Sequence, residues 1–173
     1  SMMDGYWQVV EGKGLERNPY RAGFLQLVAV SETDARAEAE YARHVEYFYP
    51  KCLHVPAHWF APPGNQDYRS LLATNRNPVR RPEDPKALRY RDFVEKGYVI
   101  AGSPATVRQQ LTECIKTLRV GHLMVLLQIG SMPKDLAQHN TGLFAREVLP
   151  HVRDLWPEWK DRWWPSAARN GHG

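Results

Sequence analysis

The stretch VIAGSPATVRQQL, residues 99–111, is typical of a strand that ends in a tight turn and continues as a helix. Val99 and Ile100 are strand formers, and a glycine at position 102 permits the turn. Ser103 is a good helix N-cap, and Pro104 stands at the first helical position, where proline is best tolerated. Apolar residues then recur on one helical face, at Val107, Leu111, Ile115 and Leu118. The stretch therefore predicts one βα unit.

A second βα unit comes earlier in the chain, after a lead-in with turn residues at 11–19. Residues 22–30, AGFLQLVAV, form a short apolar run that predicts a strand buried on both faces. In residues 31–49, Ser31 or Thr33 can cap the first turn. The apolar face of the predicted helix carries Ala37, Tyr41, Val45 and Phe48.

A third strand and a third helix follow Gly121. Residues 122–128, HLMVLLQ, are almost continuously apolar, which is typical of a parallel strand that is covered on both sides. The turn IGSMPKD then leads into a helix that ends near Pro150 and carries Leu136, Leu143, Phe144 and Val148.

The order of these elements is strand, helix, insertion, strand, helix, strand, helix. It predicts an α/β fold with parallel strands and right-handed crossovers, either an open sheet or a piece of a (β/α) TIM barrel. A complete barrel takes about 250 residues, so this chain would hold about three of its eight units. We expect one domain over residues 3–164, with an irregular, proline-rich insertion at about 50–92 and a flexible tail at 165–173.

Composition excludes several classes of protein. Although 23 basic residues face 19 acidic ones, for a net charge of +4, the basic residues are spread along the chain, so we expect no nucleic-acid partner. Cys52 and Cys114 lack a CxxC spacing, which argues against a disulfide scaffold or a zinc–thiolate site. The longest apolar run is far shorter than the ~20 residues of a membrane helix, and no signal peptide is evident. We therefore expect a cytoplasmic protein without a membrane partner.

Two loops carry the candidate ligand-binding residues. The helix start at Gly102 and Ser103 offers free N–H groups that could hold a phosphate or carboxylate, although the sequence favours the simpler interpretation that Ser103 and Pro104 only begin a helix. Gln128 and Gly130 stand at the carboxyl end of the most apolar strand, where α/β proteins place ligands. Gln128 could bond the edge of a heterocycle, and Gly130 would let a flat ring approach the backbone. The alternative is a strand end that needs a flexible turn.

Metal binding and hydrolysis have little support in the sequence. His54 and His58 form an HxxxH pair, but Pro56 interrupts it and neither a glutamate of the HExxH type nor a third ligand accompanies it. Ser103 and Ser131 lack the flanking glycines of a GxSxG nucleophile elbow. We predict no metal site.

Residues 99–156 resemble the carboxyl-terminal part of bacterial luciferase-like, flavin-dependent monooxygenases. The likeness lies in the hydrophobic-Gly-Ser-Pro turn, the long helix with a Gln-rich start, the Gly-His-Leu-Met strand and the closing LFAREVLPHV helix. Residues 18–56 are similar to the strand and helix that precede these elements in that family.

The resemblance implies a (β/α) TIM barrel that binds reduced FMN supplied by a reductase and oxygenates a small organic substrate through a peroxyflavin, usually as a dimer. The family's amino-terminal half, which supplies most flavin contacts and the catalytic residues, has no counterpart here. No catalytic residue is therefore carried over, and Gly102, Ser103, Gln128 and Gly130 are the cofactor-binding candidates. We expect a chain that is inactive alone and that forms a homo-oligomer or pairs with a complementary amino-terminal half. The alternative is a non-catalytic flavin-binding or self-assembling half-barrel module, because exposed edge strands invite pairing.

Overall fold

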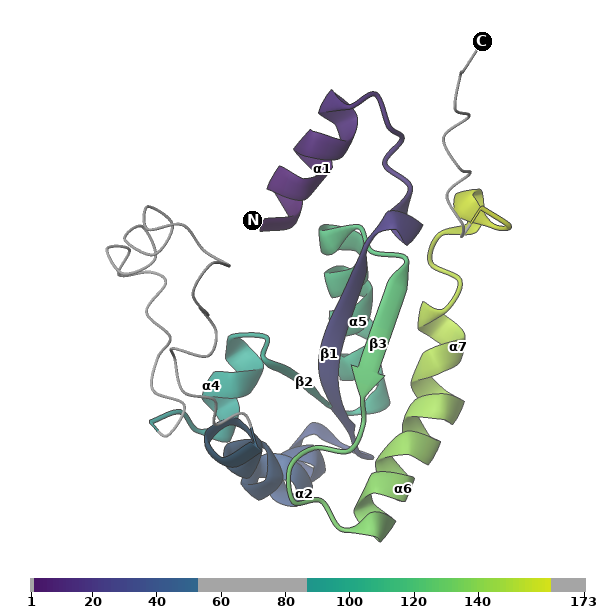
Figure 1. Ribbon diagram of the computed structural model, residues 1–173. Coiled ribbons are helices and arrows are strands. Elements are labelled where there is room, and N and C mark those ends of the chain that lie inside the picture. The colour runs from purple at the N-terminus through teal and green to yellow at the C-terminus, as the bar shows by residue number, and fades with distance from the viewer. Residues whose placement is uncertain (1, 53–86, 163–173) are drawn as a thin grey trace.

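The computed structural model describes residues 2–52 and 87–162 (Figure 1). Its sheet is parallel, with the order β2-β1-β3, and consists of β1 (Gly23–Val30), β2 (Val99–Gly102) and β3 (His122–Leu126). The central strand β1 pairs with β3 from Gly23↔His122 to Leu27↔Leu126, and with β2 from Leu27↔Val99 to Val30↔Gly102. The structure thus confirms a parallel α/β fold.

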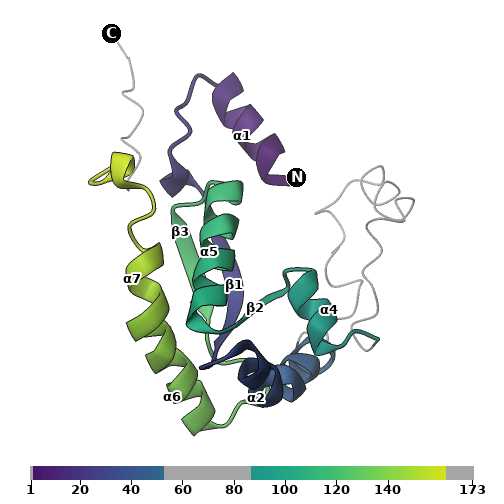
Figure 2. The same cartoon turned by 180° about the vertical axis from the view of Figure 1, so that it is seen from behind.

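Helices cover both faces of this sheet (Figures 1 and 2). The α-helices are α1 (Met2–Gly12), α2 (Asp34–Tyr47), α4 (Tyr90–Glu95), α5 (Pro104–Leu118), α6 (Lys134–Leu143) and α7 (Leu149–Val152). Short 3₁₀ turns lie at Pro19–Arg21 and Pro157–Trp159, and π-helical turns lie at Phe48–Cys52 and Phe144–Val148.

The helix starts follow from local side-chain chemistry. The Thr33 hydroxyl accepts a hydrogen bond from the Arg36 amide (3.1 Å) and caps α2. Ser103 caps α5 in the same way by accepting from the Thr106 amide (3.3 Å), with Pro104 next in the chain. The predicted caps Thr33 and Ser103 are therefore confirmed, and Ser31 has a different role described below.

The alternation of side chains along the strands divides the core into two layers. On one face, α2 and α4 pack on the sheet through a cluster that includes Leu27, Ala29, Tyr41, Val45, Phe93, Val99 and Ala101. On the other face, α5, α7 and the π-turn pack through Val28, Val30, Ile100, Val107, Leu111, Ile115, Phe144, Val148 and Val152. The apolar faces predicted for the helices of residues 31–49 and 104–118 are thus the buried ones.

Two helices differ from the sequence prediction. The lead-in contains the helix α1, which was not predicted from the sequence. Trp7 of α1 is buried, and its indole donates to the Leu118 carbonyl (3.0 Å), which fixes the helix against the end of α5. The insertion predicted at 50–92 ends earlier, because α4 begins at Tyr90. Residues 53–86 of that insertion, with His54 and His58, and the predicted flexible tail lie outside the described residues.

The strand order does not confirm the partial (β/α) TIM barrel that the sequence and the resemblance predict. In a (β/α) barrel each strand pairs with the next one along the chain, whereas here β2 and β3 both flank β1. The α5 connection therefore crosses over β1, as in an open, doubly wound sheet. Residues 2–52 and 87–162 thus form an open α/β sheet. None of the helices in these ranges is both long enough and apolar enough to cross a bilayer.

Candidate functional site at the carboxyl edge of the sheet

All three strands end at the same edge of the sheet, because they are parallel. Open α/β sheets bind ligands outside this edge, at the point where the strand order reverses, which for the order β2-β1-β3 lies between β1 and β3. Ser31 follows β1, Ser103 follows β2 and Gln128 follows β3. The predicted pairs Gly102–Ser103 and Gln128–Gly130 therefore lie on opposite sides of the central strand.

At the end of β2, a carboxylate of the chain itself bonds the loop that was predicted to hold an anion. The Ser103 amide donates to Asp34 Oδ1 (2.6 Å), and the Thr106 hydroxyl donates to Asp34 Oδ2 (3.1 Å). The Ser103 amide, followed by the Thr106 hydroxyl, lowers the pKa of Asp34. Gly102 has φ 151°, and a Cβ there would lie 2.6 Å from Asp34 Oδ1. A phosphate would have to displace Asp34 to reach these donors.

At the end of β3, Gly130 serves the packing of its loop on α2. Its φ is 56°, and a Cβ would clash with the His44 carbonyl oxygen and crowd Phe48. This close approach leaves no room for a flat ring on that side of the glycine. The exposed Gln128 amide donates to the Gly130 carbonyl (3.2 Å) and borders a shallow groove that also includes Met132, Lys134 and Gln138. Of the four predicted residues, Gln128 has the best access to a ligand from solvent.

At the end of β1, charged side chains surround a buried serine. The Ser31 hydroxyl lies 2.9 Å from Glu32 Oε2 and 2.7 Å from Glu40 Oε2. Arg36 bridges both carboxylates, at 3.2 Å from Glu32 and 2.7 Å from Glu40. His139 Nε2 lies 3.3 Å from Glu32 Oε1, so that ligand atoms of Glu32, Glu40 and His139 fall within 4.8 Å of one another.

Arg36 contacts both carboxylates of this cluster and offsets one of their two negative charges. The backbone at Glu32 and the Ser31 hydroxyl lower the pKa of Glu32, with smaller contributions from Arg36 and His139. Sequence reasoning missed the cluster. The i, i+4 spacing of Glu32, Arg36 and Glu40 could have revealed the ion pairs. It could not have revealed that α6 brings His139 to them.

Asn140 fills the switch point itself. Pairing of β1 with β3 ends at Leu27↔Leu126, and the Asn140 amide bonds both strands beyond that point. It accepts from the Val30 amide (2.7 Å) and donates to the carbonyls of Val28 (2.9 Å) and Leu127 (2.7 Å). The side chain is fully buried. An amide of the chain therefore bridges the ends of the two strands at the switch point.

A buried histidine and a serine lie next to Gly130, but their hydrogen bond runs in the wrong direction for nucleophilic catalysis. His44 Nδ1 lies 2.9 Å from Ser131 Oγ, and the Arg43 guanidinium donates to His44 Nε2 (3.1 Å). A guanidinium cannot accept a hydrogen bond, so Nε2 is the acceptor and Nδ1 carries the proton. Burial and, secondarily, the Arg43 charge lower the pKa of His44. Neutral His44 therefore donates to Ser131 and cannot remove its proton.

Comparison with solved structures gives a structural similarity, while comparison by sequence gives none. No family model matches the chain, and no curated protein matches it. A solved structure, the oxygenating constituent of 3,6-diketocamphane monooxygenase from the CAM plasmid of Pseudomonas putida, is similar with a TM-score of 0.47 and 16% identity. That protein is described as a type II Baeyer–Villiger monooxygenase in complex with FMN. The similarity covers 87% of this chain but 38% of that one.

Proposed function

We propose that this chain is the carboxyl-terminal part of a luciferase-like, FMN-dependent monooxygenase and that it neither holds FMN nor oxygenates a substrate by itself. The sequence resemblance over residues 18–56 and 99–156 supports the family, and the parallel α/β sheet agrees with it. We attribute the open strand order to the absence of the remaining strands, since in a complete barrel β2 would lie between β1 and β3.

The observation that carries the proposed inactivity is the bond between Asp34 and Ser103. An FMN phosphate at the start of α5 would meet the Asp34 carboxylate on the donors it needs, and two anions at one site repel each other. Gly130 packs closely on α2, so its backbone does not offer space to the flavin ring on that side either. The residues present do not fit the cofactor in this arrangement, so its chemistry belongs to the completed enzyme.

Flavin titration tests this proposal directly. Purified chain is mixed with FMN and passed over a size-exclusion column while light scattering and flavin absorbance are recorded. We expect flavin-free protein, and no oxygen consumption above background when FMN, a flavin reductase and NADH are added. Stoichiometric co-elution of FMN with the wild-type chain would contradict the proposal. The same titration is run on Asp34→Ala, which removes the carboxylate from the Ser103 amide. Asp135→Ala, which removes an acid from the first turn of another helix, is its matched control.

A second candidate function is a self-assembling module, and one observation favours it. Leu25 of β1 pairs in register with Met124 of β3, and both lie on the face of the sheet that packs on α2 and α4. These helices cover this face only farther along the strands, so Leu25 and Met124 are 50% and 57% exposed. Two such faces could pack together and remove this apolar surface from water. We expect a dimer that Leu25→Thr and Met124→Thr weaken and Val9→Ala, on exposed α1 surface, does not. A wild-type monomer at high concentration would overturn this candidate.

A further inference from the structure

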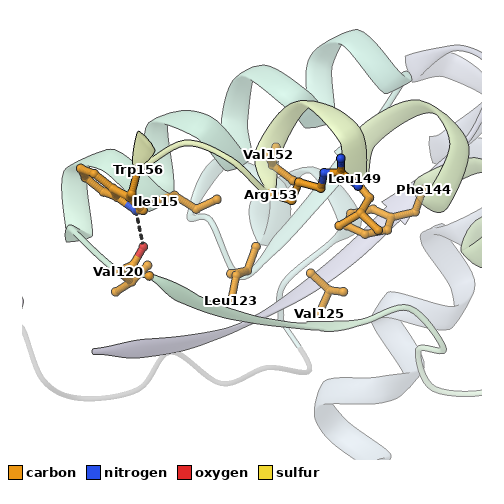
Figure 3. A pocket seen from close by; sticks show the side chains of 10 residues that line it. Ile115, Val120, Leu123, Val125, Phe144, Leu149, Val152, Arg153 and Trp156 are labelled. Carbon is orange, nitrogen blue, oxygen red and sulfur yellow. Dashed lines mark hydrogen bonds between the residues drawn. The ribbon is translucent and has the colours of Figure 1, made fainter. Parts of the chain in front are cut away.

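A cavity of about 200 Å³ lies between β3 and α7, beside the amino-terminal part of β3 (Figure 3). Leu123 and Val125 of β3 form one wall, and Leu149 and Val152 of α7 form another. Trp156 closes one end. The cavity is separate from the carboxyl-edge residues described above and independent of the proposed function.

The walls are held in place by the rest of the fold. The Trp156 indole donates to the Val120 carbonyl (2.9 Å), and the Arg119 guanidinium lies 5.3 Å from the centre of its ring. Val152 is buried in the core that α7 shares with α5. A ligand therefore meets a preformed cavity, which lowers the ordering cost of binding.

The lining selects for an apolar group. Most lining side chains are aliphatic or aromatic, and the Val120 carbonyl is already bonded to Trp156, so water would find few partners inside. Dry apolar cavities of about 150 Å³ are known to hold benzene. A group of about the size of one aromatic ring thus matches the volume.

An arginine lies at the mouth of the cavity. Figure 3 shows the guanidinium of Arg153 next to Leu149, over Leu123 and Val125. Its Nε donates to Asp154 in a largely exposed pair (2.9 Å), and a guanidinium has five N–H donors, so Arg153 keeps donors for a second acceptor. Two N–H groups of one guanidinium match the two oxygens of a carboxylate.

We propose that this cavity binds a small organic acid, with its ring-sized apolar group between β3 and α7 and its carboxylate on Arg153. The apolar part supplies most of the affinity, and the arginine selects the acid over a neutral analogue of the same shape.

The test compares 3-phenylpropanoate with 3-phenylpropan-1-ol by titration calorimetry on the full chain. We expect millimolar or tighter binding of the acid, and Arg153→Gln should weaken it about fivefold, the size of an exposed charge pair, while the alcohol is unaffected. Arg146→Gln, an exposed arginine on the preceding π-turn that does not line the cavity, is the matched control. Val125→Phe should fill the cavity and abolish binding of both compounds.

Three results would overturn the proposal. The first is that neither compound binds at millimolar concentration, and the second is that Arg153→Gln leaves the preference for the acid unchanged. The third is that Val125→Phe converts a dimer into a monomer in light scattering, which would assign the cavity to a second copy of the chain. If circular dichroism shows that Val125→Phe does not fold, Leu149→Trp at the exposed rim replaces it, with the same expected loss of binding.

Discussion

The carboxylate of Asp34, in the first turn of α2, lies 2.6 Å from the backbone nitrogen of Ser103, at the start of α5. One negative charge is thereby placed at the positive ends of two helices. Charge of this sign at a helix N-terminus is stabilising, and an amide that donates to a carboxylate bonds it more strongly than it would a neutral acceptor.

Removing this carboxylate should destabilise the fold. Because the Asp34 side chain is largely exposed, solvent screens its bonds, and we expect Asp34→Ala to lower the free energy of unfolding by about 1 kcal/mol. Urea unfolding followed by circular dichroism measures the change, with Asp135→Ala as the control. Equal losses for the two variants would mean that the bond to Ser103 contributes no more than an ordinary helix-dipole contact.

The same bond makes a prediction about acid. The folded-state pKa of Asp34 is lowered, so its contribution is complete above the ordinary carboxyl value of 3.8 and is lost as pH falls through the lower folded value. The stability difference between wild type and Asp34→Asn should therefore be constant from pH 7 to pH 5 and shrink below about pH 4. A difference that stays constant down to pH 2 would contradict the assignment.

His44 predicts a second, milder dependence on pH. Burial lowers the pKa of His44 most, and the Arg43 charge lowers it further. As pH falls below the ordinary value of 6.5, His44 therefore takes up a proton in the unfolded chain at a higher pH than in the folded one, which favours unfolding. Wild type should therefore lose more stability between pH 7 and pH 5 than His44→Gln does, and the comparison cancels the other histidines. Parallel curves for the two proteins would mean that folding does not perturb this group.

Asn140 should be the most costly polar side chain to remove. Asn140→Ala leaves the Val30 amide and the carbonyls of Val28 and Leu127 without this partner, at a total of about 3 kcal/mol. The neighbouring Thr141→Ala, which removes one exposed bond to the Ala137 carbonyl, should cost less than about 0.5 kcal/mol. The urea midpoints of Asn140→Ala and Thr141→Ala are compared. Similar midpoints for the two variants would show that water replaces the Asn140 amide at the switch point.

Gly130 tests the packing of the loop after β3 on α2. Gly130→Ala should destabilise strongly, by about 2 kcal/mol or more, because it combines a positive φ with a clash against the His44 carbonyl. Gly5→Ala, in α1 with open space around its Cα, should instead be neutral or slightly stabilising. Thermal unfolding of both variants provides the comparison, and a tolerated Gly130→Ala would show that the loop is free to move.

Local chemistry in the sequence predicts most of the secondary structure. Ser103 with Pro104, and Thr33 ahead of an apolar face, mark helix starts that depend only on near neighbours. Local chemistry does not predict the helix α1, because its position depends on the contact of Trp7 with Leu118, which lies far along the chain. Strand order escapes it too, since apolar runs indicate buried strands without saying which strand lies between the others.

The candidate site was harder to predict than the fold. Gly102, Ser103, Gln128 and Gly130 do lie at the carboxyl ends of β2 and β3, as parallel strands require. What the sequence conceals is how the chain uses them. Asp34 is separated from Ser103 by much of the chain, and Asn140 comes from a helix whose approach to β1 no local pattern encodes.

The central position of β1 has a consequence for synthesis on the ribosome. This strand is made first, yet both of its pairing partners are translated only after the long segment at 53–86. Until β2 and β3 emerge, an apolar strand with two open edges must remain unpaired, and long-range parallel pairing is intrinsically slow. Nascent chains halted before residue 99 are therefore the species in which aggregation and chaperone binding should concentrate.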